Sequence, residues 1–235
     1  MLYGMTNPHG GDIYGGDVRL DFSANTNPFG TPPGVMEAVS RALPDMHRYP
    51  DPYCRRLVEK IAAFEGVNRD DILCGNGAAE LIYAYCGAVR PKTALEPAPT
   101  FSEYALGLSQ VGCQVKPYYL TPDRDFALDS HFPDYLTEIL PEAVFLCNPN
   151  NPTGMLIHPE VLKDILDVCR ENRIRLFVDE CFLDLSDNGQ SMKSYLAEYP
   201  NLFILKAFTK SYGMAGIRLG YCLCSDRELL KAMSR

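Results

Sequence analysis

Short apolar runs alternate along the chain with amphipathic stretches of helical period. The runs that we predict as strands are 71–74, 93–96, 114–120, 143–147, 175–179, 202–207 and 219–224. The stretches that we predict as helices are 55–65, 78–86, 101–111 and 159–172. Strand and helix signals that alternate in this way predict an α/β layer structure.

Several predicted strands are apolar at consecutive positions rather than at every second position. Val144, Phe145 and Leu146 form one such run, and residues 202–205 form another. This pattern is typical of strands that are covered by helices on both faces, as in parallel sheets. The sequence therefore predicts a three-layer α/β/α fold with a mostly parallel sheet of about seven strands.

Proline and glycine are concentrated near the N-terminus. Residues 27–34 read Asn-Pro-Phe-Gly-Thr-Pro-Pro-Gly, a composition that interrupts regular elements and favours extended chain. We therefore expect an N-terminal arm with part of a small domain over residues 1–48, and a large domain over residues 49–235.

The composition limits the possible partners. The chain has 235 residues, of which 46% are hydrophobic, and a formal net charge of -8, so it offers no broad attraction for nucleic acid or an anionic membrane. Its nine cysteines are an odd number without a C-x-x-C pair, which predicts buried thiols of a cytoplasmic protein and no metal site. No stretch approaches the roughly 18 apolar residues of a membrane span. We expect small molecules as partners.

Ligands of open α/β sheets bind beyond the carboxyl ends of strands, so the loops after the predicted strands are the places to inspect. The loop at 75–80, Gly-Asn-Gly-Ala-Ala-Glu, opens into a helix whose free N–H groups suit a phosphate. Glycine is also the default turn residue, so this signal is weak by itself. The loop at 148–154, Asn-Pro-Asn-Asn-Pro-Thr-Gly, offers amides that can bind oxygen atoms, with an Asx-turn cluster as the alternative interpretation.

Two further strand ends carry an acid and a lysine. Asp179 can face a pyridinium nitrogen and keep it protonated, although a single acid in this place can equally cap the next segment. Lys210 lies in an apolar segment bounded by glycines, where its amine can form an imine, and Thr209 and Arg218 can bind a phosphate. Together these residues indicate a site for pyridoxal 5'-phosphate (PLP) with Lys210 as the point of attachment.

These motifs occur in the order found in the class I/II aminotransferases, a family of fold-type I PLP enzymes, and the chain resembles that family over residues about 20 to 224. The resemblance implies that Lys210 is the catalytic residue that forms the Schiff base, that Asp179 pairs with the ring nitrogen and that Asn151 bonds the ring phenolic oxygen. Phe101 takes the position that stacks on the ring. The residues implied to hold the cofactor phosphate are Gly77, Ala78, Ala79, Thr209 and Arg218.

The resemblance also implies partners. Tyr49 matches a tyrosine that reaches the phosphate of the neighbouring subunit, which implies a homodimer with shared active sites. The residues expected near the substrate are His9, Asn27, Tyr104 and Asn151.

Two subfamilies look close, and the substrates of both carry phosphate: the L-threonine O-3-phosphate decarboxylases of cobalamin synthesis and the histidinol-phosphate aminotransferases. The stretches 9–13 and 20–28 look more like the decarboxylases, and Phe182 replaces a tyrosine that is usual in the aminotransferases. We therefore expect decarboxylation of threonine phosphate to aminopropanol phosphate, with transamination as the alternative.

Two departures from the family's pattern keep a further interpretation open. Ala207 stands where relatives often have Ser or Thr, so we expect one bond fewer to the phosphate. Relatives extend well beyond Arg235, and the region beyond carries the arginine that binds the substrate carboxylate. We therefore expect a truncated chain that lacks most of the small domain, unless Arg19, Arg48 or Arg55 replaces that arginine. A cofactor-binding remnant without turnover is accordingly a third possibility. A nucleotide-binding domain is disfavoured because the glycine turn fits neither nucleotide-binding fingerprint.

Overall fold

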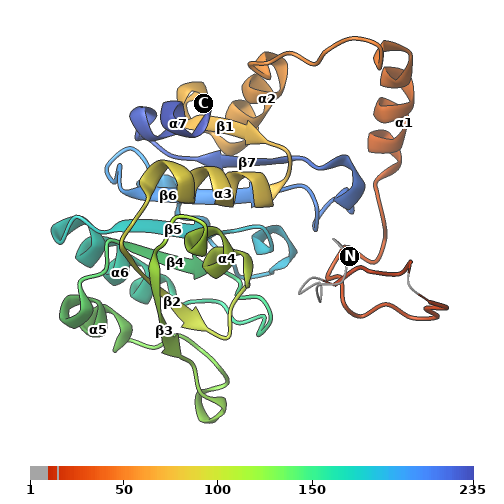
Figure 1. Ribbon diagram of the computed structural model, residues 1–235. Coiled ribbons are helices and arrows are strands. Elements are labelled where there is room, and N and C mark those ends of the chain that lie inside the picture. Colours follow the sequence, from red (N-terminus) through yellow and green to blue (C-terminus); the bar gives the residue numbers. More distant parts are fainter. Residues whose placement is uncertain (1–9, 15) are drawn as a thin grey trace.

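The structure, a computed structural model, describes residues 10–14 and 16–235, and its centre is a single sheet between two layers of helices (Figure 1). The strands are β1 (Ile72–Gly75), β2 (Thr93–Ala98), β3 (Gln114–Tyr119), β4 (Ala143–Cys147), β5 (Arg175–Asp179), β6 (Leu202–Ala207) and β7 (Gly220–Leu223). The helices are α1 (Pro33–Ala42), α2 (Arg55–Glu65), α3 (Ala78–Val89), α4 (Glu103–Ser109), α5 (Phe132–Ile139), α6 (Pro159–Glu171) and α7 (Arg227–Met233). The 3₁₀ turns are η1 (Leu43–Asp45), η2 (Arg69–Asp71), η3 (Pro122–Arg124), η4 (Leu183–Leu185), η5 (Met192–Tyr195) and η6 (Ala215–Ile217).

The sheet has the strand order β1-β7-β6-β5-β4-β2-β3. Strand β7 is antiparallel to both of its neighbours, and the remaining neighbours are parallel. The predicted seven-stranded, mostly parallel sheet is therefore confirmed. Helices α1, α5 and α7 were not predicted from the sequence.

Consecutive apolar residues in the central strands serve two separate cores. In β4, Val144 and Leu146 face the core that α2, α5 and α6 cover, whereas Ala143, Phe145 and Cys147 face the core under α3, α4 and α7. Because successive side chains of a strand point to opposite faces, a strand buried on both sides needs apolar residues at every position. This explains the uninterrupted apolar runs and confirms the three-layer arrangement.

The direction of the strands gathers several loops at one edge of the sheet. Strand β1 runs parallel to β6, since both are antiparallel to β7. The carboxyl ends of β1, β4, β5 and β6 therefore lie at the same edge, where β7 begins. This edge brings the four predicted motifs together.

A buried cluster of charges joins α2 to β6. The Glu65 carboxylate accepts hydrogen bonds from Lys193 at 2.8 Å and from the Tyr221 hydroxyl at 2.5 Å, and it lies 3.0 Å from the Lys206 amine. Burial alone would raise the pKa of Glu65, but these three partners together hold it below its usual value. The cluster holds β6, the strand that precedes Lys210, against α2.

The N-terminal arm, defined here as the described residues before 55, lies beside this edge, and within it only Cys54 packs against a core (Figure 1). None of its described residues is buried, and among residues 10–14 and 16–235 the first buried one is Val58. No helix within the described part of the chain is long and apolar enough to cross a membrane.

Candidate active site

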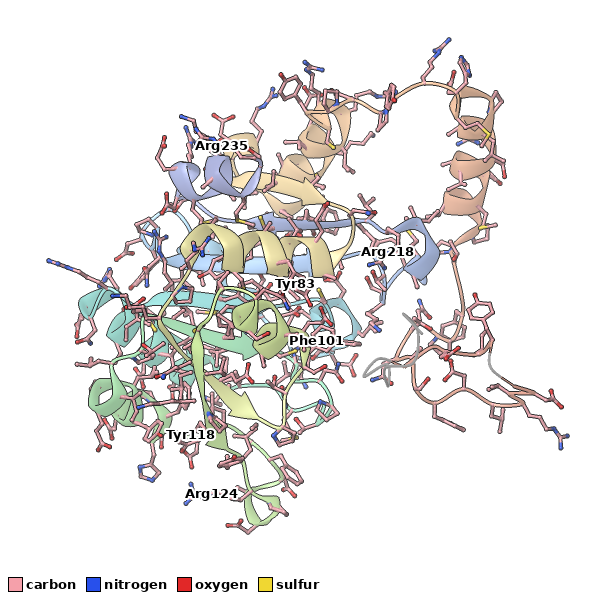
Figure 2. The ribbon with its side chains drawn as sticks, viewed as in Figure 1. Tyr83, Phe101, Tyr118, Arg124, Arg218 and Arg235 are labelled. Carbon is pink, nitrogen blue, oxygen red and sulfur yellow. The ribbon has the colours of Figure 1, made fainter. Side chains whose placement is uncertain are left out.

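A cavity of about 270 Å³ opens at the carboxyl-end edge of the sheet. Eight of the residues that the sequence assigns to the cofactor line it: Ala78, Ala79, Phe101, Asn151, Asp179, Thr209, Lys210 and Arg218. They come from the start of α3, from the end of β5, from the loops after β2, β4 and β6, and from the turn before β7. Figure 2 labels Phe101 and Arg218, which approach the cavity from different strands.

One end of the cavity is suited to an anion. Helix α3 begins at Ala78, so its first N–H groups are free to bind an acceptor and its dipole favours negative charge there. Gly77 precedes the helix with a φ of 87°, and a Cβ placed on it would lie 2.5 Å from Nη2 of Arg218. Only glycine therefore allows the Arg218 guanidinium to lie against the start of α3. A guanidinium and a helix N-terminus at one place form a site for phosphate.

A buried carboxylate lies elsewhere in the same cavity. Asp179 ends β5, and its Oδ2 accepts a hydrogen bond of 2.7 Å from the Tyr104 hydroxyl while its Oδ1 accepts one of 2.9 Å from the Cys181 N–H. Burial raises the pKa of Asp179, and these hydrogen bonds oppose that rise. The two bonds fix the orientation of the carboxylate, so it is pre-positioned for a cationic ring nitrogen.

Lys210 is held in the cavity as a partly desolvated amine. Burial lowers the pKa of Lys210, because removal from water disfavours the ammonium form, and the nearby Cys181 and Asp179 oppose this shift. The amine lies over the Phe182 ring, 5.3 Å from its centroid. A lysine with a lowered pKa is more often present as the free amine, which is the form that attacks an aldehyde.

In the asparagine-rich loop at 148–154, some side chains hold the loop in place and one lines the cavity. The amide of Asn150 donates to the Pro99 carbonyl at 3.0 Å and to the Thr153 hydroxyl at 2.9 Å, and Oδ1 of Asn148 accepts from the Ile157 N–H at 2.9 Å. These two residues fasten the loop, whereas Asn151 lines the cavity. Asn151 is therefore the asparagine of this loop that is placed to meet a ligand, and its binding role stays a prediction.

Four described residues predicted to act on substrate or cofactor lie outside the cavity lining, one of them Gly77, which immediately precedes the lining residue Ala78. Tyr104 is fully buried behind Asp179, where its hydroxyl is engaged, so its position favours a role in holding that carboxylate. Asn27 of the arm donates from its side-chain amide to the Ser211 carbonyl at 2.8 Å, which places it against the Lys210 loop. Tyr49 is fully exposed on the arm. His9 lies outside the described residues.

The cavity also contains residues that the sequence did not single out. Cys147, Cys181 and Glu103 line it, together with the noted Phe182 and Ala207. Strand β5 ends at Asp179, so strand alternation does not extend to Cys181, and no local pattern marks it.

The chemistry of the lining residues fits PLP. The cofactor carries a phosphate, a basic ring nitrogen and an aldehyde, and the cavity offers an anion site beside Gly77, a buried carboxylate at Asp179 and an amine of lowered pKa at Lys210. Without a side chain, Gly77 leaves the room that the Arg218 guanidinium needs. Phe101 supplies an apolar wall for a ring.

Comparison with known proteins agrees with this architecture. Residues 18–235 match the family model described as aminotransferase class I and II. A threonine-phosphate decarboxylase of Salmonella typhimurium is 36% identical over 219 residues, which cover 93% of this chain and 60% of that protein. A histidinol-phosphate aminotransferase of Methanococcus aeolicus is 30% identical over 216 residues, 90% of this chain and 57% of that protein.

Solved structures give the same answer for the fold. The histidinol-phosphate aminotransferase of Clostridium acetobutylicum superposes with a TM-score of 0.81 at 29% identity and covers 90% of this chain and 62% of that one. The chain therefore belongs to the aminotransferase class I and II family, whose members depend on PLP. It spans about 60% of the length of these relatives.

Proposed function

We propose that this chain binds PLP in the cavity through Lys210 and takes part in PLP-dependent conversion of a phosphorylated amino acid or amino alcohol. The observation that carries the proposal is the convergence of the Lys210 amine, the Asp179 carboxylate and the anion site at Gly77 and Arg218 on one cavity. When bound, the cofactor supplies an electron sink for negative charge that develops at the substrate Cα.

The residues of the chain have separate tasks in this proposal. The backbone N–H groups of Ala78 and Ala79, with Thr209 and Arg218, bind the cofactor phosphate and so fix the position of the ring. Asp179 keeps a proton at the ring nitrogen, and Tyr104 holds Asp179 in place. Asn151 binds the ring's phenolic oxygen, and Phe101 packs against the ring face.

Lys210 has a second task once a substrate amine has replaced it. Its amine is then free to carry a proton at Cα. In a decarboxylase it returns a proton to Cα after CO₂ has left, whereas in an aminotransferase it first removes the proton from Cα. The orientation in which the residues of the cavity would hold the substrate would decide whether the carboxylate or the proton leaves Cα.

Decarboxylation of L-threonine O-3-phosphate is the specific activity that we favour. Two threonine-phosphate decarboxylases are 36% and 37% identical to the chain, and the histidinol-phosphate aminotransferases are 30–33% identical. Phe182, which lies under the Lys210 amine, lacks the hydroxyl of the usual aminotransferase tyrosine. A histidinol-phosphate aminotransferase is the alternative, and a cofactor-binding chain without turnover is the third possibility.

We further propose a cytoplasmic homodimer in which Tyr49 reaches the cofactor phosphate of the partner subunit, and in which the arm belongs to a small domain. The side chain of Tyr49 is fully exposed, so its ring is not covered by the described part of its own chain. This exposure supports the proposed role of Tyr49. All nine cysteines are unpaired, as in proteins of a reducing compartment.

The test uses the purified chain with PLP. It maps the lysine that carries the cofactor, compares two lysine variants and measures the product formed from each candidate substrate. Borohydride reduction followed by peptide mapping should place the cofactor on Lys210, and Lys210→Ala should abolish this adduct while the exposed Lys116→Ala leaves it unchanged. Threonine phosphate should then release CO₂ and give aminopropanol phosphate.

Each other outcome has a distinct meaning. An adduct on another lysine would overturn the cofactor site. Amino transfer from histidinol phosphate to 2-oxoglutarate without CO₂ release would replace the decarboxylase by the aminotransferase. An adduct on Lys210 with no product from either substrate would leave a cofactor-binding chain without turnover.

A further inference from the structure

The start of β7 packs tightly against the start of α3. Gly220 is the first residue of β7, where it pairs with Gly75 of β1 on one side and with Ala207 of β6 on the other. A Cβ placed on Gly220 would lie 2.9 Å from the carbonyl carbon of Gly77 and 3.0 Å from the backbone nitrogen of Ala78. Both are backbone atoms, which cannot turn away as the end of a flexible side chain can. The peptide group that begins α3 therefore fills the space that a side chain at position 220 would need.

This peptide group belongs to the anion site of the cavity. Helix α3 begins at Ala78, so the N–H group of Ala78 is among those that are free to bind an acceptor. Arg218, two positions before Gly220, brings its guanidinium to the same place, in the space that a side chain on Gly77 would fill. Each of the two segments thus has a glycine where a group of the other segment approaches. The two sides of the anion site fit together through this pair of glycines.

We propose that Gly220 is a positioning residue for the cofactor phosphate: because it has no side chain, the Ala78 N–H group and the Arg218 guanidinium can bind one phosphate together. This inference rests on the proposed function, since it concerns how the same cavity binds PLP. Gly220 is buried and does not line the cavity. It therefore acts only through the segments on either side of it.

Space, and not an unusual backbone conformation, is what glycine provides at this position. The φ of Gly220 lies outside the left-handed region, so alanine can adopt the same backbone conformation. The added methyl group would contact the Gly77–Ala78 peptide and would lie 3.2 Å from the Lys206 carbonyl oxygen. Strand β7 is held by pairing on both of its sides. We therefore expect the start of α3 to shift, and the Ala78 N–H group to move away from the phosphate.

Gly216 provides a matched control in the turn that carries Arg218. It lies in η6, two positions before Arg218, and its φ is likewise outside the left-handed region. A Cβ placed on Gly216 would have no heavy atom within 4 Å apart from its neighbours along the chain. Gly216→Ala therefore adds the same methyl group close to Arg218 but leaves the anion site as it is.

The experiment compares PLP with 5'-deoxypyridoxal, which has the same ring and aldehyde but no phosphate. Borohydride reduction and peptide mapping first test whether both ligands react at Lys210 of the unchanged chain. Spectroscopic titration then gives the dissociation constant of each ligand for the unchanged chain and for the two glycine variants. Gly220→Ala should weaken PLP binding by about tenfold or more, the loss of one hydrogen bond to a charged group, without weakening 5'-deoxypyridoxal binding. Gly216→Ala should match the unchanged chain with both ligands.

The two ligands separate this inference from the proposed function. If neither reacts at Lys210 of the unchanged chain, the cofactor site is wrong and both proposals fall. If both react, but Gly220→Ala weakens both equally or changes neither, Gly220 does not position the phosphate and this inference alone is overturned. Partial unfolding of the variant would lower the number of binding sites but not the ratio of the two dissociation constants, so it cannot imitate the expected result.

A measurement on the unchanged chain covers the case in which Gly220→Ala does not fold. Inorganic phosphate, which forms no bond with Lys210, should compete with PLP for the anion site. It should also slow amide hydrogen exchange, resolved by residue, at Ala78 and at Gly220 together, because the two segments then hold one anion between them. Slower exchange at Ala78 without a change at Gly220 would overturn the inference.

Discussion

The body of the molecule, residues 55–235, and the N-terminal arm are built on opposite principles. The body buries two apolar clusters on the two faces of its sheet. The arm has no buried residue in its described part, and it exposes large apolar side chains such as Phe22, Phe29 and Tyr49. Yet the arm is fastened to the Lys210 loop, where the Asn27 N–H donates to the Lys210 carbonyl at 2.9 Å.

This difference indicates where stability and where site geometry originate. Burial of apolar surface stabilises the body, and every residue that lines the cavity belongs to the body. The arm contributes hydrogen bonds but little burial, and its exposed apolar side chains are available to another surface, as the proposed homodimer requires. Substitutions should therefore act through stability in the body and through local order in the arm.

The largest effect is expected where the body buries charge. Glu65→Gln removes the nearer counter-charge of Lys206, whose side chain is only 6% exposed, and leaves that ammonium with the more distant Asp184 carboxylate at 3.8 Å. Loss of one partner of a buried pair costs about 3–5 kcal/mol in the free energy of unfolding. Chemical denaturation of the two proteins at neutral pH measures this difference.

The pH dependence of the free energy of unfolding gives a second test of the same variant. The pKa of Glu65 is lowered in the folded state, so its contribution to stability is present above the unfolded pKa of about 4.3 and is lost as the pH falls through the lower folded value. The advantage of the unchanged protein over Glu65→Gln should shrink across that acidic range. Glu59→Gln, on the exposed face of the same helix, is the matched control and should change little. Equal losses for both variants would contradict the prediction.

The sequence predicts the body far better than the arm. The runs in β4 and β6 are apolar at every position because both faces of the sheet are covered, and this signal depends on local sequence alone. Helix α5 has only eight residues, little more than two turns, so its apolar positions repeat too few times to separate a helix from a short strand or loop. The conformation of the arm depends on contacts with residues more than 180 positions away, such as the Asn27 amide with the Ser211 carbonyl, which no local pattern reveals.

The sequence likewise predicts only part of the candidate site. Its loops could be predicted because ligand-binding residues follow strand ends in such sheets. The hydrogen bond between Tyr104 and Asp179 could not, because it depends on the packing of α4 over β5. The sequence placed Tyr104 with the substrate, whereas the structure places it behind Asp179. Which thiols share the cavity, as those of Cys147 and Cys181 do, likewise follows only from three-dimensional packing.

An intermediate effect is expected at the junction of body and site, where two buried tyrosines can be compared. The Tyr104 hydroxyl donates to Asp179 at 2.7 Å, whereas the Tyr85 hydroxyl, buried in the same core, has no hydrogen-bond partner in the described part of the chain. Tyr104→Phe should lower the free energy of unfolding by about 1.5–3 kcal/mol, the usual worth of a hydrogen bond to a charged group. It should also raise the pKa of Asp179 further and so weaken PLP binding.

Tyr85→Phe is the matched control, since it removes an unpaired hydroxyl from an equally buried ring. It should leave stability unchanged or slightly improved, because a buried hydroxyl without a partner is unfavourable. Denaturation curves and a fluorescence titration with PLP measure both properties. If the two variants lose the same stability, the Tyr104 hydroxyl does not hold Asp179.

The smallest effect on stability is expected in the arm. Asn27→Ala removes the part-buried bond from its amide to the Ser211 carbonyl, which is worth about 1 kcal/mol. Because the backbone bond to Lys210 and the bond from the Thr31 hydroxyl to the Gly213 carbonyl remain, the body should unfold almost as before. Amide hydrogen exchange should instead become faster in the arm and in the Lys210 loop together, since each orders the other. Ser40→Ala, an exposed change on α1, should leave both segments unchanged. Faster exchange confined to the arm would show that the Lys210 loop keeps its conformation by its own contacts, and the body would then be independent of the arm at the site as well as in its core.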